Sequence, residues 1–231
     1  MDRLAENLHA VRERVDAAAR DAGRRPGDVS LLAVSKTWPA DDVRRLAGLG
    51  QLDFAENKAQ ELTGKAAELT DLPLRWHFVG QLQRNKVNAV TSVGAVVHSV
   101  DSIRLADALA RAGERDGRPV PVFVQVDLDD EQQDPGRGGV STGLVAELAD
   151  HGAGLPGLTL RGLMAVAPRG AEPGPAFTRL AALADRVRTD HPEAIELSAG
   201  MSGDLEQAVA AGATLVRVGT ALFGARPLPS G

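Results

Sequence analysis

The stretch that decides the fold is VSLLAV at residues 29–34, a short and almost wholly apolar run that leads into Ser35 and Lys36. Continuous apolar runs of this kind are typical of parallel strands that are buried on both faces. The eight runs of this kind cover residues 29–34, 52–55, 76–79, 95–100, 122–126, 158–163, 194–197 and 215–218.

Amphipathic helical patterns lie between these runs. They cover residues 41–49, 58–68, 103–115, 144–151, 177–188 and 205–211, with a weaker candidate at 85–91. Before the first run, an apolar stripe at helical spacing predicts one more amphipathic helix, formed by Leu4, Leu8, Val11 and Val15. Eight strands that alternate with helices predict a single (β/α)8 TIM barrel with an extra N-terminal helix, and an open doubly wound sheet is the alternative.

The composition is that of a globular protein and narrows the class of partner. Hydrophobic residues make up 43% and charged residues 25% of 231 positions, which suits one domain over residues 1–231. The net charge of -5 is not gathered into long blocks, which disfavours a nucleic-acid surface. The absence of cysteine excludes disulfide scaffolds and Cys-ligated zinc. With no signal-peptide pattern and no membrane-length apolar stretch, we expect a cytoplasmic protein that binds no membrane.

Lys36 stands at the carboxyl end of the first predicted strand. In a TIM barrel this end of the strands carries the active site. Partial removal from water would disfavour the charged amine, which raises the fraction of neutral amine that can attack a carbonyl. The position therefore indicates an imine-forming lysine, and the alternative is a lysine that reaches past the strand into solvent.

Two segments rich in Gly, Ser and Thr follow the last two predicted strands. Residues 198–204 read SAGMSGD, and Gly219 and Thr220 follow the eighth strand. In such barrels these loops commonly form a phosphate site from backbone N–H groups and hydroxyls, so phosphate binding is predicted here. The alternative is that the glycines serve tight turns only. Ser202 is also expected to cap the helix predicted at 205–211.

Three polar side chains interrupt the apolar strands or follow them directly. Arg217 lies in the eighth run, where its burial would be costly without an acceptor or an anion, so it is a candidate for the ligand pocket. Asn57 follows the second run and His77 lies within the third, and both are candidates for the barrel mouth. Asn57 could instead be a helix cap, and His77 a structural histidine.

The longest irregular stretches, residues 127–139 and 168–175, would lie at the same end of the barrel. Acidic residues at 127–134 lack the spacing of a calcium loop, so we interpret them as solvated surface and expect no metal.

Several of these motifs together resemble one family, the pyridoxal 5′-phosphate (PLP) homeostasis proteins. The motifs are AVSKT at 33–37, ENK at 56–58, WHFVGQLQRNK at 76–86, HSVDS at 98–102, RGLMA at 161–165, LSAGMS at 197–202 and VRVGTALFGAR at 216–226. They span nearly the whole chain. The sequence departs from the family's usual pattern at Ala55, Asp127, Arg137 and Ala199.

The resemblance implies a barrel like the N-terminal domain of alanine racemase, with PLP held as a Schiff base on Lys36. It places Arg217 at the pyridine nitrogen, and Asn57 and His77 near the ring. The residues it places around the phosphate are Ser198, Met201, Ser202, Gly219 and Thr220. It implies a role in vitamin B6 homeostasis without robust catalytic turnover, with PLP-dependent apoenzymes as candidate partners.

Two enzyme functions are the alternatives. An amino-acid racemase of the alanine racemase type would use the imine lysine and a tyrosine, and this sequence contains no tyrosine. A PLP-free, phosphate-binding barrel enzyme, such as an isomerase or aldolase, would use Lys36 to form an imine with its substrate. We expect a monomer, because no extra dimerisation element is evident.

Overall fold

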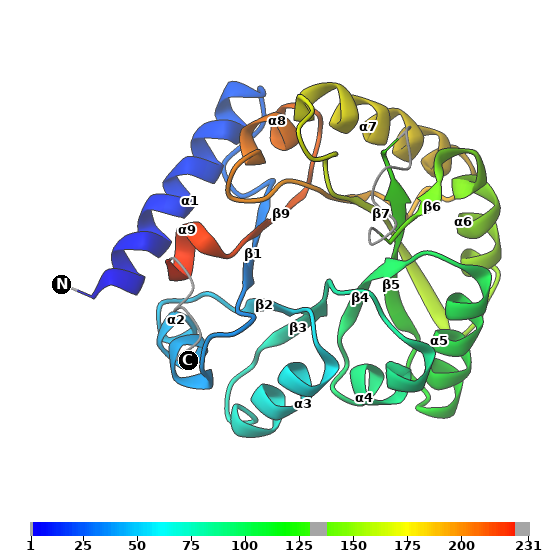
Figure 1. Ribbon diagram of the computed structural model, residues 1–231, viewed down its shortest axis with the longest axis horizontal. Coiled ribbons are helices and arrows are strands. Elements are labelled where there is room, and N and C mark those ends of the chain that lie inside the picture. Colours follow the sequence, from blue (N-terminus) through cyan, green and yellow to red (C-terminus); the bar gives the residue numbers. More distant parts are fainter. Residues whose placement is uncertain (1, 130–137, 225–231) are drawn as a thin grey trace.

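The computed structural model describes residues 2–129 and 138–224, in which eight parallel strands close into a barrel that is ringed by helices (Figure 1). Around the barrel the order is β1, β2, β3, β4, β5, β7, β8 and β9, and β9 pairs with β1. The short β6 pairs with β5 outside this ring. The strands are β1 (Ser30–Val34), β2 (Asp53–Glu56), β3 (Arg75–Phe78), β4 (Val96–Val100), β5 (Val120–Asp127), β6 (Val140–Ser141), β7 (Leu158–Ala165), β8 (Glu196–Ser198) and β9 (Leu215–Val218). The predicted TIM barrel is confirmed, and the open sheet is excluded.

Helices connect successive strands and cover the outside of the barrel (Figure 1). They are α1 (Arg3–Asp21), α2 (Ala40–Gly48), α3 (Ala59–Glu68), α4 (Val87–Ser92), α5 (Ile103–Arg115), α6 (Val145–Ala153), α7 (Pro173–Asp190), α8 (Leu205–Ala210) and α9 (Thr220–Phe223). None of the helices in the described ranges is long and apolar enough to cross a membrane.

The extra N-terminal helix, α1, begins at a capped end and buries its apolar stripe. The Asp2 carboxylate accepts a hydrogen bond from the backbone N–H of Leu4 at 3.0 Å, which satisfies one of the free donors of the first turn. Helix α1 packs against α8 and α9, and Arg14 forms an ion pair with Glu206 of α8 (Figure 1). The predicted N-terminal helix is confirmed, and it braces the two elements that follow β8 and β9.

Side-chain alternation along the strands separates an outer core, between strands and helices, from a small inner cluster. Leu32 and Val34 of β1 form this inner cluster with Ala55 of β2 and Leu215 of β9. Because the side chains of a strand alternate with a period of two, the next position of the β1 row after Val34 is Lys36. The same rule carries the β9 row from Leu215 to Arg217.

Three details differ from the sequence-based expectation. Helix α9 was not predicted, because it has only four residues and ends before Gly224, where φ is +96°. Helix α7 begins at Pro173, inside the stretch expected to be irregular, since proline is tolerated in a first helical turn. Strand β6 was not predicted either, and it directly follows the other such stretch, 127–139. Residues 130–137 of that stretch, including Arg137, lie outside the described residues.

Candidate functional site

A cavity of about 390 Å³ opens where the strands end at their carboxyl side. It is lined by residues from the segments that follow β1, β2, β3, β7, β8 and β9. Seven of the nine residues proposed from the sequence line it, namely Lys36, Asn57, Met201, Ser202, Arg217, Gly219 and Thr220. The predicted lysine and both predicted phosphate loops therefore share one cavity.

Lys36 is half-buried and follows β1 directly, next to a residue with an unusual backbone conformation. Thr37 has a φ of +70°, and it is the only non-glycine residue with positive φ among those described. A β-branched residue in this region is strained by about 1–3 kcal/mol, which the surrounding structure must offset. Part of that offset is a hydrogen bond from the Thr37 backbone N–H to the Glu61 carboxylate at 2.7 Å. Strain of this kind is concentrated at functional sites, which supports a role for Lys36.

A buried ion pair binds Ser35, the residue that precedes Lys36. Glu56 is fully buried and forms an ion pair with Lys65 of α3, which is itself buried. Both side chains also bind Ser35, because the Ser35 hydroxyl donates to Glu56 at 2.7 Å and the Lys65 amine donates to the Ser35 carbonyl at 2.7 Å. Burial raises the pKa of Glu56, although the contact with Lys65 opposes that shift. This pair was not predicted, and the one sequence signal for it is a carboxylate at the end of an apolar strand.

Arg217 lies at the base of the cavity, is buried, and forms no ion pair with a carboxylate among the described residues. Its guanidinium donates to the Ser198 carbonyl and the Ser198 hydroxyl, both at 2.7 Å, and to the Ala165 carbonyl at 2.8 Å. Burial lowers the pKa of Arg217 to about 10, so the group remains a cation at neutral pH. A guanidinium has five N–H donors, and these three bonds leave two for a ligand in the cavity.

Ser198 and His77 do not line this cavity, which corrects the position expected for each of them. Ser198 is fully buried and serves as an acceptor for Arg217. His77 lies deeper in the barrel, since Ala55 pairs with His77 and Glu56 with Phe78 across β2 and β3. The same register places Asn57 level with Val79, two residues beyond His77. Val79 therefore lines the cavity in place of His77. The sequence predicted His77 as a candidate for the barrel mouth or as a structural histidine, and it did not predict the depth of His77 in the barrel.

The loops after β8 and β9 are tied to each other and to α1. The Ser202 hydroxyl accepts a hydrogen bond from the Ala221 backbone N–H at 3.3 Å, and its carbonyl accepts one from Arg14 at 2.8 Å. Ser202 was predicted to cap α8, but Asp204 occupies the cap position, because the helix begins at Leu205, two residues later than a cap at Ser202 requires. This leaves Ser202 at the cavity wall, where its hydroxyl joins the two predicted phosphate loops.

Close backbone approaches shape the wall of the cavity at two glycines. A Cβ atom on Gly80 would lie 2.1 Å from the Asn57 carbonyl oxygen, and one on Gly219 would lie 3.2 Å from the Val34 carbonyl oxygen. Trp38, which also lines the cavity, stacks on Phe223 of α9 with ring centroids 5.7 Å apart. Glycine is therefore required for packing at Gly80. The contact between Trp38 and Phe223 joins α9 to the segment that follows Lys36.

Two of the departures from the family pattern lie in well-packed surroundings. Ala55 is fully buried in the inner cluster, and Ala199 is buried after β8. Asp127 accepts a hydrogen bond from the Asp129 backbone N–H at 3.0 Å, which is a local turn contact. Within the described ranges, no cluster of three His, Cys, Asp or Glu side chains is arranged to hold a metal ion.

Known proteins are similar to this chain in sequence and in fold. A family model described as alanine racemase, N-terminal domain, matches residues 4–227. The pyridoxal phosphate homeostasis protein of Mycobacterium leprae is 43% identical, covering 99% of this chain and 96% of its own. The protein of the same name from Escherichia coli K12 is 39% identical, covering 98% of each chain.

Solved structures agree with this result. PipY of Synechococcus elongatus, with PLP bound, superimposes with a TM-score of 0.83 at 37% identity, covering 96% of this chain and all of that one. Alanine racemase from Corynebacterium glutamicum, at 17% identity and a TM-score of 0.71, covers 99% of this chain and 62% of its own and shares the fold. From these matches over nearly its whole length, the chain belongs to the family of pyridoxal phosphate homeostasis proteins, built on the barrel of the alanine racemase N-terminal domain.

Proposed function

We propose that this protein binds PLP in the cavity at the carboxyl ends of the strands, with Lys36 as the point of covalent attachment through a Schiff base. The observation that carries the proposal is that Lys36, the loops after β8 and β9, and the buried cation Arg217 line one cavity. Its volume of about 390 Å³ suits a small cofactor. The family membership and the PLP-bound structure of PipY support the same ligand.

The residues of the cavity fit the three parts of PLP. Ser202 and Thr220 supply hydroxyl groups for a phosphate, and Gly219 lets the backbone approach it closely. The Lys36 amine matches the aldehyde. Arg217 offers its remaining N–H donors to the pyridine nitrogen, and Asn57 lies on the wall beside Gly80. Met201 is 39% exposed at the rim, where its side chain would cover the phosphate end.

The character of Arg217 favours a binding and homeostasis role over robust turnover. When bound, PLP supplies an aldehyde and a ring that can accept electrons from a substrate attached to it. A guanidinium that stays protonated donates to the ring nitrogen and holds that nitrogen unprotonated, which weakens the ring as an electron acceptor. We infer that the protein binds and releases PLP inside the cell, with PLP-dependent apoenzymes as candidate recipients and a monomer as the working form.

An absorption spectrum of the purified protein, with and without added PLP, tests the proposal. We expect a band at about 420 nm, by analogy with other PLP–lysine sites. The chain has four lysines, and Lys86 is exposed and lies outside the cavity, so Lys86→Ala is the matched control for Lys36→Ala. The band should be lost in Lys36→Ala and kept in Lys86→Ala. No band in the wild type with excess PLP would refute the proposal and favour a PLP-free barrel enzyme.

A further inference from the structure

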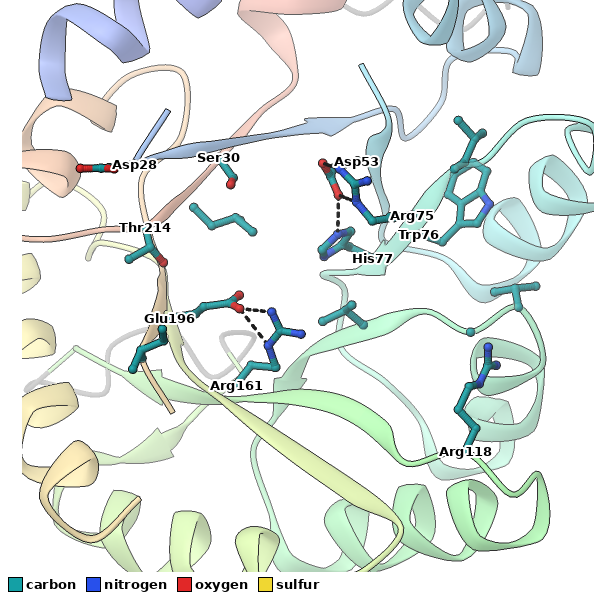
Figure 2. Close-up of a pocket in the computed structure, with 16 residues that line it drawn as sticks. Asp28, Ser30, Asp53, Arg75, Trp76, His77, Arg118, Arg161, Glu196 and Thr214 are labelled. Atoms are coloured by element: carbon teal, nitrogen blue, oxygen red, sulfur yellow. Dashed lines mark hydrogen bonds and ion pairs between the residues drawn. The ribbon is translucent and has the colours of Figure 1, made fainter. Parts of the chain in front are cut away.

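A second cavity, of about 710 Å³, lies at the opposite end of the barrel, where the strands begin. Its charged side chains are arranged in pairs, and Figure 2 shows Arg161 facing Glu196 and both Arg75 and His77 facing Asp53. The Arg75 guanidinium binds the Asp53 carboxylate at 2.6 and 2.5 Å. Charges at this end therefore largely neutralise one another.

From this cavity a line of hydrogen bonds runs through the barrel interior. Nε2 of His77 lies 3.5 Å from the Asp53 carboxylate, and Nδ1 of His77 lies 2.9 Å from Nε2 of His98. Nδ1 of His98 lies 3.0 Å from the Ser198 hydroxyl, which accepts a hydrogen bond from Arg217 at 2.7 Å. His98 and Ser198 are fully buried. The line thus joins one cavity to the cation at the base of the other.

The two ends of the line determine the direction of every hydrogen bond in it. Arg217 can only donate, so the Ser198 hydroxyl accepts from it and is free to donate its own proton to Nδ1 of His98. An ionised Asp53 can only accept, so His77 carries its proton on Nε2 and offers Nδ1 as an acceptor to His98. Both histidines are then neutral Nε2–H tautomers, and every hydrogen bond in the line has one donor and one acceptor.

The surroundings of His98 support the neutral form that this arrangement needs. Burial lowers the pKa of His98 well below its ordinary value, and the nearby cations Arg217 and Arg161 add to that effect. The ring of Phe123 stacks on His98 with centroids 4.3 Å apart and an angle of 19° between the planes, which fixes the plane of the imidazole. An apolar core would avoid the cost of burying these polar groups, so their presence calls for a role beyond packing.

We propose that His77, His98 and Ser198 form a positioning relay that fixes the guanidinium of Arg217 and couples it to the cavity at the opposite end of the barrel. The relay keeps the Ser198 hydroxyl turned toward His98, so its lone pairs face Arg217. The charged groups that face the relay are Asp53 and Arg75 at one end and Arg217 at the other, with Arg161 beside His98. Its effect on PLP rests on the proposed function, but the relay itself does not.

The relay is tested first without PLP, by two-bond proton–nitrogen NMR spectra of the histidine rings. We expect His77 and His98 as neutral Nε2–H tautomers at pH 7. A His98 ring with its proton on Nδ1 would overturn the proposal, because the Ser198 hydroxyl could then not donate to His98. Since this measurement uses the wild type without PLP, its outcome does not depend on the proposed function or on whether a variant folds.

Variants at the cavity end then test the coupling. His77→Phe removes the acceptor for His98 and should change the signals of His98 and of the Arg217 guanidinium. His77→Asn keeps an acceptor oxygen near the place of Nδ1 and should restore them. Arg118→Gln, which changes a residue of the same cavity outside the relay, is the matched control and should leave both unchanged. Unchanged Arg217 signals in His77→Phe would refute the coupling.

The consequence for the ligand is tested at Ser198. Ser198→Ala should raise the Kd for PLP about tenfold, the effect of losing one hydrogen bond to a charged group, and Ser198→Thr should restore most of the affinity. An unchanged Kd in Ser198→Ala, measured in a protein that still shows the PLP band, would overturn the positioning role and leave PLP binding standing. Loss of the band in the wild type would instead refute the proposed function.

Discussion

The two ends of the barrel differ in the partners of their arginine side chains. At the amino ends of the strands, Arg75 and Arg161 are neutralised by Asp53 and Glu196. At the carboxyl ends, Arg217 is buried deeper, and its partners among the residues that the structure describes are the uncharged oxygens of Ser198 and Ala165. A buried cation without a carboxylate partner is costly to keep unless an anion or an acceptor completes its surroundings. The comparison therefore indicates that one end is completed by the chain itself and the other by a ligand.

The largest expected effect concerns the ion pair behind Lys36. Lys65→Met would leave Glu56 as a buried carboxyl without its cation, and breaking a buried pair in this way costs about 3–5 kcal/mol of stability. The free energy of unfolding in urea measures the loss. The double variant Glu56→Gln with Lys65→Met should recover much of it, because no buried charge remains. A single variant as stable as the wild type would show that the pair does not support the Lys36 segment.

A direct comparison of the two ends uses one arginine from each. Arg217→Leu should raise the Kd for PLP about tenfold to hundredfold, through loss of charge-assisted hydrogen bonds. Arg161→Leu should leave that Kd within about twofold, because Arg161 lies in the other cavity and its partner is Glu196. Titration of absorbance with PLP measures both. Equal losses of affinity would remove the distinction between the two ends.

Substitution of a glycine at the wall of the Lys36 cavity should change the stability less, and it should have the opposite sign to a glycine substitution in α3. Gly80→Ala would bring a Cβ atom against the Asn57 carbonyl oxygen and should cost about 1–3 kcal/mol of stability. Gly64→Ala, in α3 with no atom near the added Cβ, should instead stabilise the protein by about 0.5–1 kcal/mol. Thermal unfolding of the two variants compares them. A Gly80→Ala protein as stable as Gly64→Ala would mean that the backbone at Asn57 can shift at little cost.

The smallest effect is a pH dependence at the amino end. Burial alone would raise the pKa of Asp53, but hydrogen bonds from His77 and Arg75 lower it to about 2. The folded pKa is thus below the unfolded value of about 3.9, so this contribution to stability is present above pH 4 and is lost as the pH falls toward 2. Urea unfolding at pH 5 and pH 2.5 should show a smaller difference in Asp53→Asn than in the wild type. Equal differences would show that Asp53 is not stabilised as an anion.

The sequence predicts the barrel and most of the cavity at the carboxyl ends of the strands, because those features depend on local periodicity. Lys36 and Arg217 continue apolar rows whose period of two puts them inside the barrel, and the loops after β8 and β9 carry their own turn residues. The depth of His77 depends on how β3 pairs with β2, which no local pattern determines. The burial of Lys65 depends on its contact with Ser35, thirty residues earlier in the chain.

The central claim is that Lys36 carries PLP in the cavity at the carboxyl end of the barrel. Reduction of the PLP-loaded protein with borohydride, followed by digestion and mass spectrometry, locates the attached group directly among the four lysines. The account predicts modification at Lys36 and none at Lys58, Lys65 or Lys86. Modification spread over the exposed lysines, or found at Lys65 in place of Lys36, would contradict it.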